Sequence, residues 1–262
     1  MQSFKSGDEI IHFRDEGPRS EIAFVFVNSL GTDLRVWDNV IKELDQKYRT
    51  VRVDKRGHGL STNFENNISI SILANDLKLL ISSLEIKNIV LVGLSIGGLI
   101  ALEFLKSTSS IVTGLILSDT AAKIGTSNMW SDRIARVKRG GIESISDDIL
   151  SRWFSNDFLV NRNEELQLWR SMLTRTSTLG YLGCCKAIAD CDLRDEAKAI
   201  SIPTLLIVGE EDGSTPVNVV KDTANLIKNS EFKIIEGAGH LPCVEKPKIF
   251  SNELLKFLGR LK

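Results

Sequence analysis

The sequence predicts an α/β fold: a mostly parallel, eight-stranded sheet flanked by helices, with an inserted helical cap. Short apolar runs rich in β-branched residues alternate with amphipathic segments over most of the chain, which is typical of a parallel sheet covered by helices. Between Ala121 and about Ala199 the alternation stops, and the stretch has helical periodicity and many charges but no clear strand. We therefore expect a core of residues 1–120 and 200–262, and a cap of residues 121–199 between the sixth and seventh strands.

The strands of this fold are expected at the apolar runs and the helices at the amphipathic segments. Strands are predicted near residues 2–5 and at Glu9–Arg14, Ile22–Val27, Thr50–Asp54, Ile89–Gly93, Gly114–Ser118, Pro203–Gly209 and Phe232–Glu236. Helices are predicted at Arg35–Gln46, Ile70–Leu84, Ile96–Lys106, Val217–Lys228 and Lys248–Leu261.

The composition excludes several classes of protein. The chain has 262 residues, a net charge of −1, and 42% hydrophobic and 26% charged residues, which are ordinary values for a globular protein. No basic run favours nucleic acid or a membrane surface, and the longest uncharged stretch, residues 88–102, is too short to span a bilayer. We therefore expect no nucleic-acid or membrane partner, and a monomer or a small homo-oligomer.

The cysteines and the N-terminus indicate a reducing compartment. The four cysteines show neither C-x-x-C spacing nor nearby histidines, so disulfides and zinc are not expected, and Cys184 and Cys185 are expected in the core of the cap. The first residues, MQSFKSGDEI, contain no apolar segment of a secretory signal, which favours a cytoplasmic location. No histidine–carboxylate cluster has the spacing of metal ligands, so we expect no metal and no cofactor.

A Gly-x-Ser-x-Gly motif lies at the junction of a predicted buried strand and a predicted helix. Residues 89–98 read IVLVGLSIGG, so Ser95 falls between Gly93 and Gly97. In this context the motif forms a nucleophile elbow, in which a strained backbone exposes the serine hydroxyl and small neighbours prevent clashes. The motif alone is common by chance, so the prediction depends on a base and an acid elsewhere in the chain.

The base that activates a serine hydroxyl must be sought among three histidines. His240 follows the last predicted strand on a glycine-rich loop, at the sheet edge where sites of open α/β sheets assemble. His58 follows the Thr50–Asp54 strand and is the competing base, whereas His12, inside the first strand, is expected to be a surface or packing residue. We predict that His240 is the base.

The base in turn needs an acid that fixes its tautomer and stabilises the imidazolium. Asp212 follows the strand predicted at Pro203–Gly209 and is the first choice, and Asp119, at the end of the preceding strand, is the alternative. The chain order Ser95, Asp212, His240 is that of nucleophile, acid and base in α/β-hydrolases. Three loops in the right order are far more specific than the serine motif alone.

Two backbone N–H groups are needed to bind the oxyanion of a tetrahedral intermediate. One is expected from Ile96, which follows Ser95 at a helix N-terminus. The other is expected from Leu30, in the loop after the Ile22–Val27 strand, because the adjacent glycine allows close approach of the backbone. The same loop can also serve as a plain strand-to-helix turn in which Asp33 caps the next helix, and both roles are compatible.

Over nearly its whole length the sequence resembles the α/β-hydrolase superfamily and, within it, the 3-oxoadipate enol-lactonases. The matching segments are NSLGTDLRVWD at 28–38, VDKRGHGLS at 53–61, GLSIGG at 93–98, DTAAKIG at 119–125, RWF at 152–154, GYLGCCKAIADCDLRD at 180–195 and GHLPCVEKP at 239–247. The chain departs from this family at Pro242 and Cys243, where Ser-Asn is usual, and at Asp119, where Asn is frequent.

The resemblance implies a serine hydrolase that opens 3-oxoadipate enol-lactone to 3-oxoadipate in the catabolism of aromatic compounds. A small anionic lactone as substrate requires a cation, and Arg133, with Trp130 as an apolar wall, is expected to bind it. A surface arginine and a cap-packing tryptophan are the alternative. Three other functions remain open: a carboxylesterase, lactonase or C–C hydrolase on the same scaffold, a non-catalytic ligand receptor, and a structural interaction protein.

Overall fold

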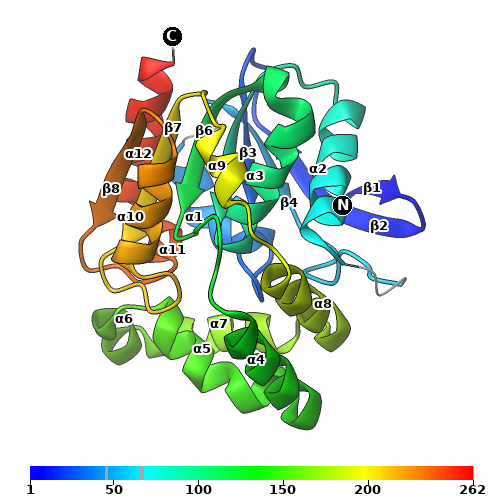
Figure 1. Ribbon diagram of the computed structural model, residues 1–262, viewed down its shortest axis with the longest axis vertical. Coiled ribbons are helices and arrows are strands. Elements are labelled where there is room, and N and C mark those ends of the chain that lie inside the picture. The colour runs from blue at the N-terminus through cyan, green and yellow to red at the C-terminus, as the bar shows by residue number, and fades with distance from the viewer. Residues whose placement is uncertain (45–46, 65–67, 262) are drawn as a thin grey trace.

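The protein has an α/β fold built on one eight-stranded sheet (Figure 1). The computed structural model describes residues 1–44, 47–64 and 68–261. The strand order is β1-β2-β4-β3-β5-β6-β7-β8. The β1–β2 and β2–β4 pairs are antiparallel and the other neighbours are parallel, so the predicted mostly parallel sheet is confirmed.

The strands and helices alternate along the core and give way to helices alone between β6 and β7. The strands are β1 (Gln2–Ser6), β2 (Glu9–Glu16), β3 (Ala23–Val27), β4 (Arg49–Val53), β5 (Ile89–Leu94), β6 (Val112–Ser118), β7 (Thr204–Gly209) and β8 (Ser230–Ile235). The core helices are α1 (Asp38–Glu43), α2 (Ile70–Ser83), α3 (Ile96–Thr108), α10 (Val217–Leu226), α11 (Pro242–Glu245) and α12 (Pro247–Arg260). Between β6 and β7 lie α4 (Ser127–Gly140), α5 (Ser146–Trp153), α6 (Asn156–Asn161), α7 (Asn163–Thr174), α8 (Thr178–Ala189) and α9 (Arg194–Lys198). The 3₁₀ helices are η1 (Leu34–Trp37), η2 (Ser109–Ile111) and η3 (Ile142–Ile145).

Helices cover both faces of the sheet. α1 and α12 pack together on one face, and α2, α3, α9 and α10 lie on the other (Figure 1). Every residue of β3, β4, β5 and β7 is buried. Burial on both faces explains why β3, β5 and β7 are nearly continuous apolar runs instead of alternating ones. In contrast, β4 contains two buried arginines, Arg49 and Arg52, which pair with carboxylates of β2.

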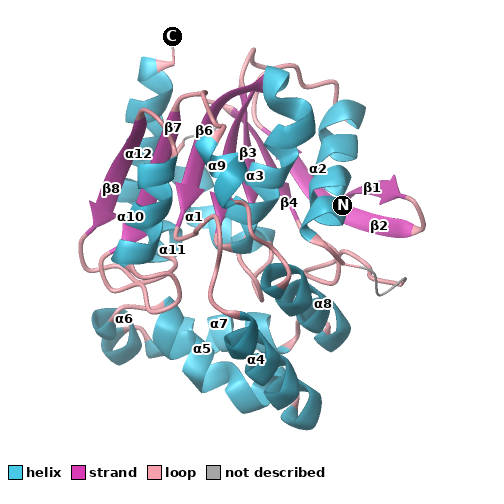
Figure 2. Cartoon of the chain, in the orientation of Figure 1, coloured by secondary structure: helices cyan, strands magenta, loops and turns pink. Residues whose placement is uncertain are grey.

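The helices between β6 and β7 form a layer beyond the carboxyl edge of the sheet. α4 to α8 gather there, and the arrowheads of β6 and β8 point toward them (Figure 2). α9 instead packs against α3 and α10, beside the sheet. The loops that follow the parallel strands therefore lie between the sheet and α4–α8, which we call the cap.

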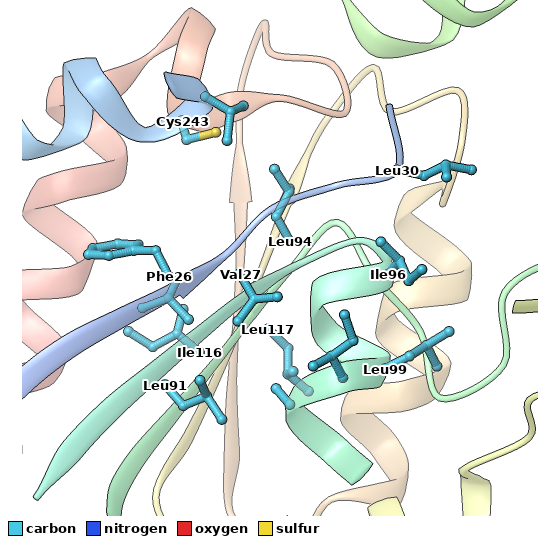
Figure 3. Packing of buried hydrophobic residues seen from close by; sticks show 14 of the residues in the cluster. Phe26, Val27, Leu30, Leu91, Leu94, Ile96, Leu99, Ile116, Leu117 and Cys243 are labelled. Atoms are coloured by element: carbon cyan, nitrogen blue, oxygen red, sulfur yellow. The ribbon is translucent and has the colours of Figure 1, made fainter. Parts of the chain in front are cut away.

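The hydrophobic core extends to the carboxyl ends of the central strands. Figure 3 shows buried side chains of β3, β5, β6 and α3 packed together in this region. The labelled ones include Phe26, Val27, Leu91, Leu94, Leu99, Ile116 and Leu117. Close packing at this end of the sheet holds the backbone of the following loops in place.

One predicted helix begins differently in the structure. The segment predicted as Arg35–Gln46 starts as the 3₁₀ helix η1 and continues as α1, and its predicted end at Gln46 lies outside the described residues. The Asp33 carboxylate accepts the N–H of Arg35 (3.0 Å), and that of Asp54 accepts the N–H of Leu34 (2.7 Å). These two bonds favour a tight first turn, which periodicity does not reveal.

The other predicted strands and helices are present, with ends that differ by one or two residues. The strand predicted at Phe232–Glu236 is β8 (Ser230–Ile235), and α10 ends at Leu226 instead of Lys228. Such differences are usual because helix and strand ends fray. Among the described residues, no helix has the length and apolar character needed to cross a membrane.

Candidate active site

Ser95 lies in a strained turn between β5 and α3. Its backbone has φ 58° and ψ −120°, a conformation that non-glycine residues rarely adopt. A Cβ on Gly93 would lie 2.4 Å from the carbonyl oxygen of Gly97, and one on Gly97 would lie 2.2 Å from that of Val27. Side chains are therefore excluded on both sides of Ser95, as expected for a nucleophile elbow.

His240 and Asp212 come from the loops after β8 and β7 and form a hydrogen-bonded pair. Nδ1 of His240 lies 3.0 and 2.9 Å from the two carboxylate oxygens of Asp212. Asp212 also accepts the N–H groups of Ser214 (2.7 Å) and Thr215 (3.0 Å) and the Thr215 hydroxyl (2.7 Å). These bonds orient the carboxylate toward the imidazole, so that Nε2 is left for a second partner.

Ser95 and His240 line the same cavity. Within the described residues no hydrogen bond joins the two side chains, and Nε2 of His240 lies 3.5 Å from the hydroxyl of Ser29. Catalytic hydrogen bonds are often long without substrate and shorten in the complex. The arrangement thus places a hydroxyl and an oriented base on one cavity wall.

The charge of this pair follows from its surroundings. Burial opposes the negative charge on Asp212, but the adjacent His240 and the bonds from Thr215 outweigh it, so the pKa of Asp212 lies below its ordinary value. Asp212 is therefore an anion near neutral pH. An anion at this position keeps a proton on Nδ1 of His240 and leaves Nε2 able to accept one.

The alternative acid, Asp119, lies beside this pair at the end of β6. Its carboxyl group accepts the N–H of Gly209 (2.8 Å) and the hydroxyl of Ser118 (2.5 Å). Asp119, Asp212 and His240 each place a polar atom within 4.8 Å of the other two. The two acids considered from the sequence are therefore neighbours, and of the two only Asp212 is hydrogen bonded to the imidazole in the described part of the chain.

The same three side chains are the one group of described residues with enough ligand atoms for a metal ion. Their oxygens already accept hydrogen bonds from Thr215, Ser118 and backbone N–H groups, and Nδ1 of the imidazole faces a carboxylate. A cation would displace these donors. The arrangement fits an acid–base network better than a metal site.

The other two histidines lie outside the cavity that contains Ser95. His58 is buried with Nδ1 3.1 Å from the carbonyl oxygen of Arg56, and burial together with Lys55 lowers its pKa well below the ordinary value. It is not positioned to act on Ser95. His12 is buried with Nδ1 2.8 Å from Asp54, so it is a packing residue and the surface alternative is wrong.

The two predicted oxyanion donors come from the loop after β3 and from the first turn of α3. Figure 3 shows Leu30 on that loop and Ile96 at the start of the helix. In residues 1–44, 47–64 and 68–261, no acceptor is found for either N–H group. Both are free to donate to an oxyanion, and the N-terminus of the 13-residue α3 adds a partial positive charge.

A buried lysine supports the loop that carries Leu30. Nζ of Lys55 donates to the carbonyl oxygens of Ser29 (2.6 Å) and Thr32 (3.3 Å). Burial lowers the pKa of Lys55 to about 8, although nearby carboxylates oppose this effect. The lysine thus fixes the peptide group that contains the Leu30 N–H and a second peptide group further along the loop.

The cap supplies the opposite wall of the cavity. Trp130 and Arg133 of α4, Arg152 of α5 and Tyr181 of α8 line it. The indole N–H of Trp130 donates to the carbonyl oxygen of Ile124 (2.7 Å), and the Arg133 guanidinium lies 4.8 Å from the Trp130 ring centre. Both cap residues predicted from the sequence therefore reach the cavity.

Two guanidinium groups, those of Arg133 and Arg152, mark the junction between this cavity and a second one. The cavity at Ser95 encloses about 40 Å³, and the outer one, between α4 and α5, about 170 Å³. Both arginines line both cavities, whereas Arg136, which lines the outer one and not the cavity at Ser95, is paired with Asp148 (2.5 Å). No described carboxylate forms an ion pair with Arg133 or Arg152, although Asp148 of the outer cavity lies near enough to interact electrostatically with both.

Glu245 of α11 ties the His240 loop to the cap. Its carboxylate accepts the N–H of Gly239 (2.7 Å), and the N–H (3.1 Å) and hydroxyl (2.5 Å) of Ser155, just before α6. The N–H of Leu241 donates to the carbonyl oxygen of Trp153 (3.3 Å). The loop that carries the imidazole is therefore anchored to the cap as well as to the sheet.

The cysteines at the base of the cap are not reactive. Cys184 and Cys185 are buried in α8, and burial raises the pKa of each thiol to about 12. Both thiols are therefore protonated near neutral pH and act as small apolar side chains, as expected for the cap core.

Sequence reasoning missed four residues that shape the site: Ser29, Lys55, Arg152 and Glu245. Each lies in a segment that matches the enol-lactonases, so the signal was present. Their roles depend on partners from distant loops, such as the carbonyl groups around Leu30, and neither motif nor periodicity reports such contacts.

The fold and the site define a class of protein. A family model described as the alpha/beta hydrolase fold matches residues 22–247, and the chain belongs to this family.

Within the family, the chain is similar to 3-oxoadipate enol-lactonases. Enol-lactonase 2 of Acinetobacter baylyi is 32% identical over 260 residues, which cover 97% of this chain and 94% of the relative. Enol-lactonase 1 of the same organism is 33% identical, with 89% and 87% covered. The enol-lactonase structure from Burkholderia xenovorans LB400 superposes with a TM-score of 0.94 at 29% identity, covering 98% of this chain and all of that one. The resemblance seen in the sequence is thus confirmed.

Proposed function

We propose that the protein is a serine hydrolase that opens 3-oxoadipate enol-lactone to 3-oxoadipate. The observation that carries the proposal is the hydrogen-bonded pair of Asp212 and His240, because His240 lines the same cavity as Ser95. Two cap arginines that have no carboxylate partner in the described residues line the opposite wall of this cavity. The names of the most similar relatives support the choice of substrate. The proposal includes a role in the catabolism of aromatic compounds, as the resemblance to these enol-lactonases implies, and a cytoplasmic location.

In the first half of the reaction, Ser95 is acylated. Nε2 of His240 takes the hydroxyl proton as Ser95 attacks the lactone carbonyl carbon. The N–H groups of Leu30 and Ile96 bind the oxyanion that forms. When the intermediate collapses, the ring C–O bond breaks, and the enol oxygen leaves with the proton from His240. An enol is a good leaving group, so this step needs little acid assistance.

In the second half, water releases the product. The ring-opened chain stays attached to Ser95 as an ester, and its enol tautomerises to the ketone. His240 then removes a proton from water, which attacks the ester carbonyl and frees the acid and the Ser95 hydroxyl. Direct attack of a His240-activated water on the lactone is the alternative route, and it leaves no ester on Ser95.

The cap arginines explain selectivity for an anion. The substrate carries a free carboxylate, which a guanidinium binds by charge-assisted hydrogen bonds. Arg133 lies over Trp130 and has no carboxylate partner in the described residues, so it can bind the substrate without breaking an ion pair. Arg152 adds a second positive charge at the same junction.

The first test is hydrolysis of the enol-lactone, generated in situ from carboxymuconolactone, and followed as loss of ultraviolet absorbance. Wild type and Ser95→Ala are compared, with Ser107→Ala as a control because Ser107 lies on the exposed end of α3. Short p-nitrophenyl esters and an acyl-homoserine lactone are run in parallel. We expect fast lactone loss that Ser95→Ala reduces by about 10⁶-fold, and weak ester activity.

The outcomes separate the competing functions. Good turnover of esters or of the homoserine lactone, with none of the enol-lactone, would contradict the proposed substrate and leave the serine chemistry intact. No turnover of any substrate would indicate a ligand receptor. A mass increase of Ser95 by one ring-opened substrate after rapid quenching would establish the ester route over direct attack by water.

A further inference from the structure

Asp119 is a buried carboxyl group that the proposed mechanism does not use. It is fully buried at the end of β6, and it has a positive φ of 48°. Neither feature is expected of an ordinary aspartate, because a buried carboxylate without a cation is costly and this backbone conformation is rare outside glycine. Among non-glycine residues, Asp and Asn adopt it most readily.

The partners of Asp119 are one backbone N–H, one hydroxyl and a second carboxyl group. Oδ1 accepts the N–H of Gly209 and Oδ2 the hydroxyl of Ser118, at 2.8 and 2.5 Å. No positive side chain pairs with Asp119 in the described residues, and the nearest ionisable neighbours are Asp212, His240 and the thiol of Cys243. The carboxylate of Asp212, in contrast, faces the imidazole directly.

Two adjacent carboxyl groups with one imidazole do not both remain ionised. When two carboxylates share a site, one keeps a proton, because the second negative charge is strongly disfavoured. Asp212 has three donors besides the imidazole, whereas Asp119 has two donors in all. The proton therefore resides on Asp119. Burial and then the charge of Asp212 raise the pKa of Asp119 well above its ordinary value, in agreement with this assignment.

Burial also keeps Cys243 out of this charge balance. The thiol comes from α11, and burial and then the nearby Asp119 raise its pKa well above the ordinary value. Cys243 is therefore neutral near neutral pH. The cluster holds one anion on Asp212, one shared proton, and the imidazole that takes up the serine proton during the reaction.

We propose that Asp119 and Asp212 act as one acid pair, in which Asp119 holds a proton and donates it in a hydrogen bond to Asp212. When Asp212 is removed by mutation, Asp119 supplies the negative charge that faces His240. Asp119 is thus a positioning residue for Asp212 in the wild type and a reserve acid. The proposal rests on the serine–histidine chemistry proposed above, but not on the identity of the substrate.

A double-mutant cycle of Asp119→Asn and Asp212→Ala tests the pair. Asparagine keeps a donor toward Asp212, an acceptor for Gly209 and tolerance of the positive φ, so Asp119→Asn should lower kcat about threefold. Asp212→Ala should lower kcat only about 100-fold, because Asp119 then ionises within 4.8 Å of the imidazole. The kcat of the double variant should be about 10⁴-fold lower than that of wild type, which is the loss expected when a triad has no acid.

The pH dependence gives a readout that a structural role would not change. In Asp212→Ala, kcat/KM should rise with pH as Asp119 loses its proton. The double variant should lack the rise that comes from Asp119. The rate of Ser95 labelling by a fluorophosphonate, measured for all four proteins, reports activation of the serine without any assumed substrate.

Infrared difference spectroscopy reports the proton itself. At neutral pH, wild type should show the carbonyl band of a buried protonated carboxyl group, and Asp119→Asn should lack it. The proposal is overturned if this band is unchanged by Asp119→Asn, or if Asp119→Asn has the same effect with and without Asp212. If the fluorophosphonate labels none of the proteins, the serine chemistry fails, and the infrared band still decides where the proton lies.

Discussion

The two walls of the cavity differ in how their functional groups are held. On the sheet side, the carboxylate of Asp212 has four hydrogen-bonded partners, and both it and His240 are almost fully buried. On the cap side, Arg133 is half-buried and Arg152 is exposed, and neither has a carboxylate partner in the described residues. The sheet side suits chemistry that needs fixed geometry, and the cap side suits recognition of a charged ligand.

The largest expected effect comes from the sheet side. His240→Gln should lower kcat by at least about 10⁴-fold on every substrate, because no other described histidine lines the cavity that contains Ser95. His12→Gln is the matched control, since that histidine lies outside the cavity, and it should change kcat by less than about threefold. The measurement is steady-state kinetics with the enol-lactone and a p-nitrophenyl ester. A comparable loss in both variants would remove the distinction between site and packing histidines.

The hydrogen bonds of the Glu245 carboxylate connect the His240 loop to the cap, and a substitution of Glu245 tests them. Glu245→Ala leaves three donors on Gly239 and Ser155 without an acceptor, so it should lower the free energy of unfolding by about 3 kcal/mol. The measurement is chemical denaturation followed by tryptophan fluorescence and circular dichroism. Asp195→Ala, whose carboxylate on α9 is exposed and pairs only with the surface Lys198 among the described residues, should leave the free energy of unfolding nearly unchanged. Equal effects of the two would show that the cap is not anchored through Glu245.

The cap side should control recognition and not chemistry. Arg133→Leu should lower kcat/KM about 30-fold for the anionic lactone, which corresponds to about 2 kcal/mol, by raising KM. It should leave kcat/KM for a neutral ester within about threefold. Arg136→Leu is the control, because Arg136 is paired with Asp148 in the outer cavity. An equal loss with the neutral ester would assign Arg133 to packing against Trp130.

The smallest effect concerns Lys55 and the pH dependence of stability. The pKa of Lys55 is about 8 in the folded protein and near 10.5 when unfolded, so between these values the unfolded state binds more protons. Lys55 therefore makes the free energy of unfolding increase with pH from about 8 to about 10.5. Relative to Lys55→Met, wild type should gain about 1 kcal/mol between pH 8 and pH 9, as measured by denaturation at pH 7, 8, 8.5 and 9. No pH dependence of the difference would show that the lysine is solvated.

The fold and the proposed site were predictable to different degrees. The alternation of strands and helices, the elbow at Ser95 and the order of Asp212 and His240 could all be inferred, because they depend on local periodicity and on the common edge of parallel strands. The 3₁₀ start of the helix after Asp33 could not, since it depends on the hydrogen bond that the Leu34 N–H donates to Asp54, a residue of another loop.

The sequence by itself determined the α/β class, the strand-to-helix turn at Ser95 and the presence of two acids at neighbouring strand ends. Only the tertiary structure decided how these acids and the histidines are placed: it turned Asp212 toward His240, buried Asp119 beside it, and placed His58 near Lys55. The physical reason is that backbone turns follow from neighbouring residues, whereas the charge and orientation of a buried side chain depend on whatever the rest of the chain packs against it.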